Sequence, residues 1–97
     1  MALPGITEKD FMAQVVQLAT LRGWRVYHTH DSRRSTEGFP DLLLLRKDKM
    51  LVRELKRSKN EKTTPEQDAW LLAFRLAKVD AGIWTPDEFA AIQKELE

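Results

Sequence analysis

Residues 40–56 read PDLLLLRKDKMLVRELK and predict a β-hairpin. An apolar run over 41–45 is followed by a charged turn at 46–49 and a second run of strand-forming residues over 50–56. Because side chains two positions apart on a strand share a face, we expect Glu54 and Lys56 to lie side by side. Asp41 begins the partner strand, where the hairpin register could bring it next to Glu54.

This hairpin would bring together side chains that are suited to phosphodiester chemistry. Two carboxylates a few ångströms apart repel each other and favour a hard divalent cation between them. A nearby ammonium can hold an attacking hydroxide or balance phosphate charge. Asp41, Glu54 and Lys56 around Mg²⁺ therefore suit hydrolysis of a phosphodiester. Taken alone, Glu-x-Lys on a strand is most often a solvated face.

The sequence on either side of the hairpin predicts helices and strands from its apolar periods. They are a helix over 8–22, a strand over 24–28, a helix over 65–78, a strand over 81–84 and a last helix ending near 96. Thr7 and Thr64 are expected helix caps, and the capping pattern recurs at Thr85. The order αβββαβα predicts one α/β domain over 1–97, built around a single mixed sheet.

Length and composition exclude several classes of protein. The 97 residues allow one domain, and 42% hydrophobic with 32% charged residues is the balance of a globular protein. The absence of cysteine excludes a disulfide framework, a thiolate zinc site and a cysteine nucleophile. The longest apolar run, Leu42–Leu45, is too short for a membrane helix, and we expect no signal peptide and a cytoplasmic protein.

The net charge of +1 is the sum of a basic segment and an acidic remainder. Residues 22–62 hold 12 of the 16 basic residues but only 6 of the 15 acidic ones. The basic excess therefore coincides with the hairpin and its flanking loops, where a phosphate backbone would approach. The total charge argues against a generic polybasic binder, but it is compatible with a nucleic-acid enzyme whose positive charge is concentrated around one site.

Loop residues on both sides of the hairpin are candidates for phosphate contacts. Arg33, Arg34 and Ser35 precede it, and Lys59 and Lys62 follow it. Arginine, lysine and hydroxyl groups suit phosphate oxygens, and a solvated loop explains these residues equally well.

Histidines and tryptophans offer weaker signals. His28 and His30 could share a strand face and bind a metal, although the carboxylates already supply a hard-cation site. Trp24, Trp70 and Trp84 each lie within an apolar period, so we expect core or dimer contacts more than base-stacking platforms.

Several motifs in order give the chain a resemblance to the VRR-NUC (virus-type replication-repair nuclease) branch of the PD-(D/E)XK nuclease superfamily. The resemblance covers nearly the whole chain and is closest to the small stand-alone members of phages and bacteria. The residues that carry it are Glu8 with Gln14, then 23–28, 31–35, 38–41, 54–56, 64–67 and 70–71.

The resemblance implies a restriction-endonuclease-like α-β-β-β-α-β core and a Mg²⁺- or Mn²⁺-dependent DNA endonuclease with a role in DNA repair. Small members are expected to act as homodimers on four-way (Holliday) junctions, in the host cytoplasm if phage-encoded. The family's functional positions match five side chains and one backbone carbonyl of this chain. The metal-binding acids correspond to Glu8, Asp41 and Glu54, the metal-binding carbonyl to Leu55, the catalytic lysine to Lys56 and a polar helix residue to Gln67.

One departure and one alternative accompany the resemblance. Arg53 precedes Glu54, where a buried strand would favour a small or apolar residue, and it should point to the face opposite Glu54. The alternative function is a non-catalytic DNA-binding module that keeps the nuclease fold. Absence of metal uptake together with salt-sensitive DNA binding would favour that alternative.

Overall fold

The computed structural model describes residues 6–29 and 36–97. The chain forms these elements in order: α1 (Glu8–Leu21), β1 (Arg25–His28), β2 (Leu42–Arg46), β3 (Lys49–Leu55), α2 (Pro65–Leu76), β4 (Asp80–Trp84), the 3₁₀ helix η1 (Pro86–Glu88) and α3 (Phe89–Glu95). The predicted order αβββαβα is therefore confirmed. Within these two ranges, no helix has both the length and the apolar character needed to cross a bilayer.

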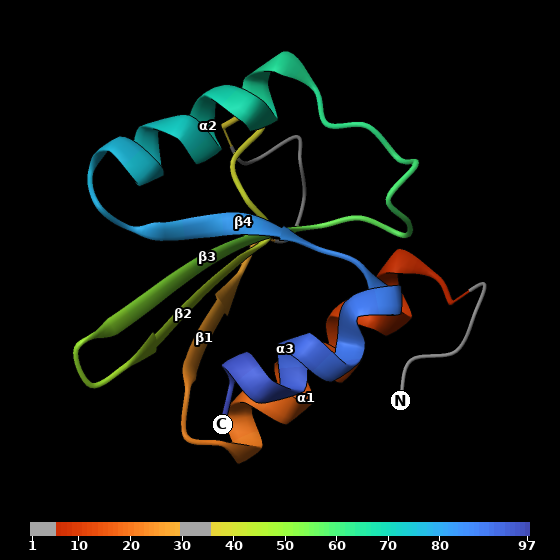
Figure 1. Ribbon diagram of the computed structural model, residues 1–97, viewed down its shortest axis with the longest axis vertical. Coiled ribbons are helices and arrows are strands. Elements are labelled where there is room, and N and C mark those ends of the chain that lie inside the picture. The colour runs from red at the N-terminus through yellow and green to blue at the C-terminus, as the bar shows by residue number, and fades with distance from the viewer. Residues whose placement is uncertain (1–5, 30–35) are drawn as a thin grey trace.

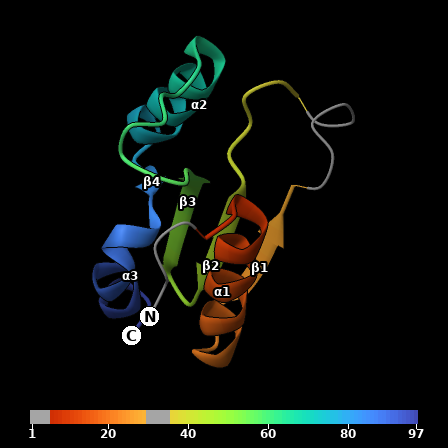
Figure 2. The ribbon, with the colours of Figure 1, turned by 90° about the vertical axis from the view of Figure 1, so that its right-hand side faces the viewer.

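The four strands form one mixed sheet in the order β1-β2-β3-β4. β1, β2 and β3 run antiparallel, whereas β4 lies parallel to β3. A parallel neighbour needs a crossover, and α2 supplies it between β3 and β4 (Figures 1 and 2). The hairpin register pairs Leu42 with Arg53, so Asp41 and Glu54 are the next residues along the two strands.

Helices cover both faces of the sheet, with α1 and α3 on one side and α2 on the other (Figure 1). The apolar run of β2 serves both layers because its side chains alternate in direction. Leu42 and Leu44 are fully buried in the larger core beneath α1 and α3. Leu43 packs into the smaller cluster beneath α2, which contains Val52 and Leu71. Leu42, Leu43 and Leu44 are therefore each tied to one layer, which fixes the hairpin register, whereas Leu45 is exposed.

Two of the three expected helix caps are present. The Thr7 hydroxyl accepts a hydrogen bond from the backbone N–H of Asp10 at 3.1 Å, and Thr64 forms a full capping box with Gln67. The cap expected at Thr85 is wrong, because its hydroxyl bonds instead to the carboxylates of Asp87 and Glu88. The chain there makes a 3₁₀ turn, and the last α-helix begins only at Phe89.

All three tryptophans pack against other apolar side chains of the fold. Trp24 and Trp84 are buried in the larger core, as expected. Trp70 is half-buried on α2, where its ring meets that of Phe39 edge-on with centroids 5.0 Å apart.

The charged side chain of Arg53 is accommodated in a buried strand by its contacts. It lies on the face opposite Glu54, as expected, and is only 3% exposed. Its guanidinium donates to the backbone oxygens of Val52 and Asp80 and forms ion pairs with the carboxylates of Asp80 and Glu95. The same group lies 4.9 Å from the ring centroid of Trp84. The expected apolar side chain is thus replaced by a cation whose donors are paired at the β3–β4–α3 junction.

Candidate active site

Two carboxylates meet where β2 begins and β3 ends. Asp41 Oδ2 accepts a hydrogen bond from the backbone N–H of Leu55 at 2.8 Å. The register of the hairpin sets Glu54 next to Asp41, close enough for the negative charge of Asp41 to raise the pKa of Glu54. The predicted juxtaposition of these two acids across the hairpin is therefore confirmed.

Glu54 is a buried carboxyl group with one oxygen paired and one unpaired. It is 3% exposed, and its Oε2 accepts a hydrogen bond from Gln67 Nε2 at 3.0 Å. Lys56 Nζ lies 3.8 Å from the same oxygen. Glu54 Oε1 is also buried, and it has no hydrogen-bond partner among the residues of 6–29 and 36–97. Buried polar atoms are almost always paired, so this oxygen is a candidate metal ligand.

Burial is the largest cause that raises the pKa of three acids here, and neighbouring negative charges add to it. Burial, followed by the negative charge of Asp41, raises the pKa of Glu54 to about 8, although Lys56 opposes the shift. Burial also raises the pKa of Asp41. The pKa of Glu8 is raised by burial and then by the charge of Asp41. A cation placed among these groups would relieve both the repulsion and the loss of hydration.

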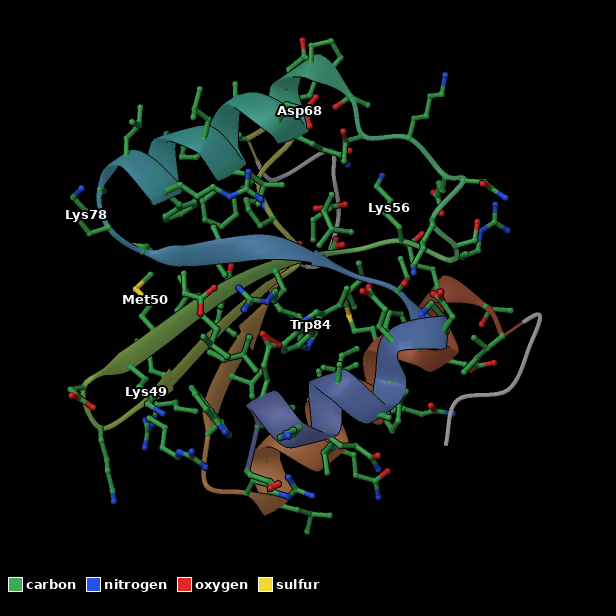
Figure 3. All side chains as sticks on the ribbon, in the orientation of Figure 1. Lys49, Met50, Lys56, Asp68, Lys78 and Trp84 are labelled. Carbon is green, nitrogen blue, oxygen red and sulfur yellow. The ribbon has the colours of Figure 1, made fainter. Side chains whose placement is uncertain are left out.

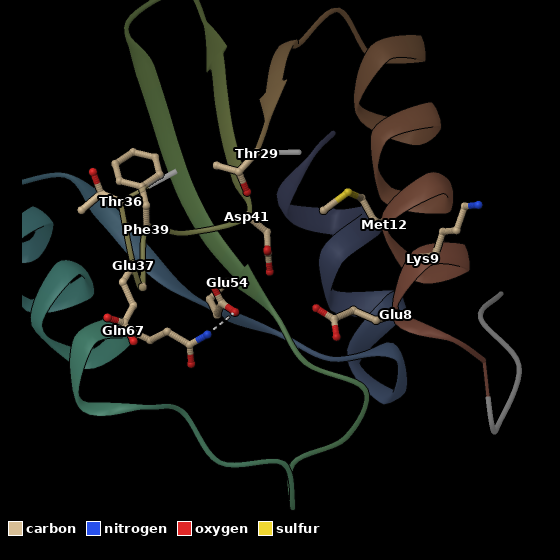
Figure 4. Close-up of a pocket in the computed structure, with 11 residues that line it drawn as sticks. Glu8, Lys9, Met12, Thr29, Thr36, Glu37, Phe39, Asp41, Glu54 and Gln67 are labelled. Carbon is tan, nitrogen blue, oxygen red and sulfur yellow. Dashed lines mark hydrogen bonds between the residues drawn. The ribbon is translucent and has the colours of Figure 1, made fainter. Parts of the chain in front are cut away.

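A pocket of about 400 Å³ gathers these acids. Helix α1 contributes Glu8, and the hairpin contributes Asp41 and Glu54. Figure 4 shows the carboxylates of all three directed into the same space from different elements. The remaining lining residues are Lys9, Met12, Thr29, Thr36, Glu37, Gly38, Phe39 and Gln67.

Gln67 reaches the pocket because the start of α2 holds its amide in one orientation. The side-chain oxygen of Gln67 accepts a hydrogen bond from the Thr64 backbone N–H at 2.9 Å. The Thr64 hydroxyl in turn accepts from the Gln67 backbone N–H at 3.2 Å. With its oxygen engaged in the capping box, the amide directs its nitrogen at Glu54. The expectation that Gln67 faces the site is met by this contact.

The wall of the pocket at residues 36–39 is fixed against α2. Gly38 has φ +82°, and a Cβ placed there would lie 2.6 Å from the carbonyl carbon of Glu66. Only glycine allows this approach of loop to helix. Next to it, the Phe39 ring packs against Trp70 and Phe74 of α2. The loop and the start of α2 therefore form one packed unit beside Glu54.

The donor set fits a hard divalent cation, although it is not drawn together around a single point. Carboxylate oxygens are the ligands that Mg²⁺ and Mn²⁺ prefer, and Glu54 offers an unpaired buried oxygen. In the described part of the chain, no three acidic or histidine side chains already enclose a metal position. The Leu55 backbone N–H contacts Asp41; the Leu55 carbonyl as a further ligand stays a prediction.

The other predicted contact residues lie away from this pocket or outside the described ranges. His30, Arg33, Arg34 and Ser35 lie outside the described residues. Lys59 is exposed and pairs with Asp87 at 3.5 Å. Lys62 is exposed in the loop before α2, and His28 ends β1.

Glu61 is an acid near the site that was not predicted from the sequence. Its negative charge helps to raise the pKa of both Glu8 and Asp41. Its Oε1 accepts a hydrogen bond from the Arg57 backbone N–H at 2.8 Å, which holds the loop after β3. No strand or helix period relates Glu61 to the other acids, so only the course of this loop places it near them.

Comparison with solved structures shows what this fold resembles. No protein-family model matches the sequence, and a search of curated proteins finds no match. A "VRR_NUC domain protein" superposes with TM-score 0.75 over 97% of this chain and 90% of its own, at 18% identity. A second structure, "VRR_NUC domain", gives TM-score 0.72, 24% identity and 90% coverage of both chains.

A more distant likeness is to Hjc of Archaeoglobus fulgidus, described as a Holliday junction resolvase from an archaeal hyperthermophile. It superposes with TM-score 0.51 at 17% identity, over 81% of this chain and 65% of that one. The chain therefore has the α/β fold of the VRR_NUC domain structures, shared more distantly with this resolvase.

Proposed function

We propose that this chain is a metal-dependent DNA endonuclease that hydrolyses phosphodiester bonds in branched DNA, with four-way junctions as its preferred substrate. One observation carries the proposal: beside a pocket, Glu54 keeps one buried oxygen unpaired among the described residues, while Gln67 and Lys56 contact its other oxygen. Asp41 lies next to this group, bonded to the backbone N–H of Leu55. The likeness in fold to VRR_NUC domain structures and to a junction resolvase supports it.

The metal would be Mg²⁺ or Mn²⁺, held by Glu8, Asp41, Glu54 and the backbone carbonyl of Leu55. When bound, the metal would supply positive charge against the phosphate and the leaving oxygen. Glu8 faces the other acids across the pocket, so it would take part through a water molecule.

The remaining side chains of the site would position the reactants. Hydrolysis forms one bond between a water oxygen and phosphorus, breaks one ester P–O bond and returns a proton to the leaving oxygen. The Lys56 ammonium, 3.8 Å from Glu54, would orient the attacking water and balance its developing charge. Gln67 would hold Glu54 in place through its hydrogen bond.

A homodimer would match the proposed substrate. A four-way junction has two-fold symmetry, so two copies of the chain related by a two-fold axis could present two sites to equivalent strands. We propose that this activity serves DNA repair in the cytoplasm, that of the bacterial host if the chain is phage-encoded. Sedimentation at micromolar concentration, with and without junction DNA, tests the dimer; a monomer under both conditions contradicts it.

The substrate assignment is tested with a panel of labelled DNAs in Mg²⁺ or Mn²⁺. We expect cleavage of a four-way junction to exceed cleavage of flap, splayed and linear duplexes, and chelation of the metal to stop it. Equal cleavage of all substrates would contradict the junction preference. Salt-sensitive DNA binding with no cleavage and no Mn²⁺ uptake by calorimetry would instead identify a non-catalytic DNA-binding module.

A further inference from the structure

Part of the basic excess of residues 22–62 lies at the end of the sheet away from the acids. Five basic residues and one acid, Asp48, line a pocket of about 760 Å³ there. We call this surface the basic end; its cations are Arg22, Arg25, Arg46, Lys47 and Lys49. Figure 3 shows Lys49 and Lys56 at opposite ends of β3. The seven residue steps between them span about 23 Å at the rise of a strand.

Two of the five cations hold the fold together. Arg46 donates to the backbone oxygens of Arg22, Leu96 and Glu97 and lies over the ring of Trp24. Arg22 donates to the backbone oxygen of Gln93 at 2.6 Å. Both arginines therefore satisfy carbonyl groups around the end of α3, while their charge stays at the surface of the pocket.

The other three cations, Arg25, Lys47 and Lys49, do not hold backbone carbonyl groups in this way. All three are exposed, and none forms an ion pair or side-chain hydrogen bond with the described residues. Lys47 has φ +57° in the tight β2–β3 turn, which places its side chain at the tip of the hairpin. Unpaired cations at the rim of a pocket are free to bind an external anion.

Edge strand β1 connects the basic end with the candidate active site. Thr29, just after this strand, lines the site pocket, and Arg25 at its start lines the basic end. Four residue steps separate them, about 13 Å, which matches about four base-pair steps along a duplex. Between them Tyr27 is 58% exposed and shares a strand face with Arg25. Neither β1 nor β2 contains an acidic residue that would repel a phosphate.

From this arrangement we infer that the basic end binds the sugar-phosphate backbone of a nucleic-acid duplex whose other part lies at the acid pocket. Arg25, Lys47 and Lys49 make the phosphate contacts, and Tyr27 offers a hydroxyl along the way. These contacts are independent of sequence and hold a duplex arm in register with the site. The inference extends the proposed function, but it concerns binding and needs no cleavage.

The test measures binding of labelled duplex DNA by fluorescence anisotropy over a series of salt concentrations, in a metal chelator. The basic-end variant is Lys47→Asn with Lys49→Gln; asparagine tolerates the positive φ of position 47. The matched control is Lys78→Asn with Lys94→Gln. Lys78 also has a positive φ, of 69°, and both control residues are exposed outside the basic end. Each variant removes the same charge, and thermal unfolding verifies that both fold.

We expect the slope of log affinity against log salt to fall by about 1.8 in the basic-end variant, about 0.9 for each lost phosphate contact, and to stay at the wild-type value in the control. Equal slopes for the two variants, or no DNA binding by the wild-type chain, would overturn the inference. So would a change in self-association of the basic-end variant with an unchanged slope, which would mark an interface between copies. Salt-dependent binding of the expected kind without any cleavage would contradict the proposed endonuclease activity. It would still support DNA binding by the basic end.

Discussion

Gln67 Nε2 donates a hydrogen bond to Glu54 Oε2 at 3.0 Å, and this contact joins helix α2 to strand β3. The oxygen of the same amide accepts from the backbone N–H of Thr64. One side chain therefore closes the start of α2 and positions a candidate metal ligand. Its two tasks can be separated by mutation.

Gln67→Ala removes both tasks, whereas Gln67→Glu keeps an acceptor for the capping box and removes the donor to Glu54. We expect the alanine variant to lose about 1 kcal/mol of unfolding free energy with the capping box, measured by urea denaturation. The glutamate variant should lose stability only through repulsion between its new carboxylate and Glu54. Both should cleave junction DNA more slowly. Wild-type cleavage by Gln67→Glu would show that the contact with Glu54 has no role in the reaction.

Gly38 provides a second test of how α2 is held at the site. Gly38→Ala would strain a residue at φ +82° and also place its Cβ 2.6 Å from Glu66 and 2.8 Å from the Gln67 backbone nitrogen. Gly23 is a matched control, because it has φ +85° and nothing nearer to a Cβ than Arg46 Cδ at 4.0 Å.

We expect Gly23→Ala to cost about 1–2 kcal/mol from backbone strain alone. Gly38→Ala should cost roughly 1–3 kcal/mol more, because the start of α2 must move. The same movement should slow cleavage, since it carries Gln67 away from Glu54. Equal unfolding free energies for the two variants would contradict the close packing of residues 36–39 on α2.

The buried guanidinium of Arg53 should matter for stability rather than for chemistry. Arg53→Lys leaves the backbone oxygens of Val52 and Asp80 without their shared donor, because an ammonium cannot reproduce the fork. We expect a loss of about 1–3 kcal/mol in unfolding free energy. Asp80→Asn is the control: the Asp80 side chain is 64% exposed, so losing that ion pair should cost less than about 1 kcal/mol. A smaller loss for Arg53→Lys than for Asp80→Asn would contradict the arrangement.

The raised pKa of Glu54 gives stability a distinctive dependence on pH when divalent metal is removed. Its pKa rises from 4.5 to about 8 on folding, so the folded chain holds a proton here that the unfolded chain has released. This contribution is fully present below pH 4.5 and is lost as pH rises through about 8. The raised pKa values of Asp41 and Glu8 act in the same direction.

Urea unfolding in a chelator at several pH values measures this effect. We expect wild-type stability to decline between pH 4.5 and about 8, and Glu54→Gln to show a shallower decline. Identical pH profiles for the two proteins would contradict a raised pKa of Glu54 in the folded chain.

Much of the fold follows from short-range patterns in the sequence. Thr7 and Thr64 lie three residues before their backbone partners, so their caps can be predicted from local spacing. The hairpin can be predicted because its apolar run, its charged turn and its alternation agree. Its register then brings Asp41 to Glu54, and a spacing of two brings Lys56 to the same side.

Contacts between distant segments could not be predicted in this way. Nothing near Arg53 in the sequence indicates that Asp80 and Glu95 would pair with it. The approach of Gly38 to α2 depends on the tertiary path of the loop, as does the charge of Glu61 near the acids. At Thr85 the local pattern was misleading, because the hydroxyl found carboxylate partners in place of backbone N–H groups.

The central claim is that Asp41 and Lys56 serve hydrolysis of branched DNA. The most direct measurement compares the rate of cleavage of a labelled four-way junction, in Mg²⁺ or Mn²⁺, by wild type, Asp41→Asn and Lys56→Ala. Circular dichroism shows that each variant is folded. We expect cleavage by the wild type and a loss of at least about a hundredfold in each variant. Equal cleavage by all three proteins would contradict the assignment of this site.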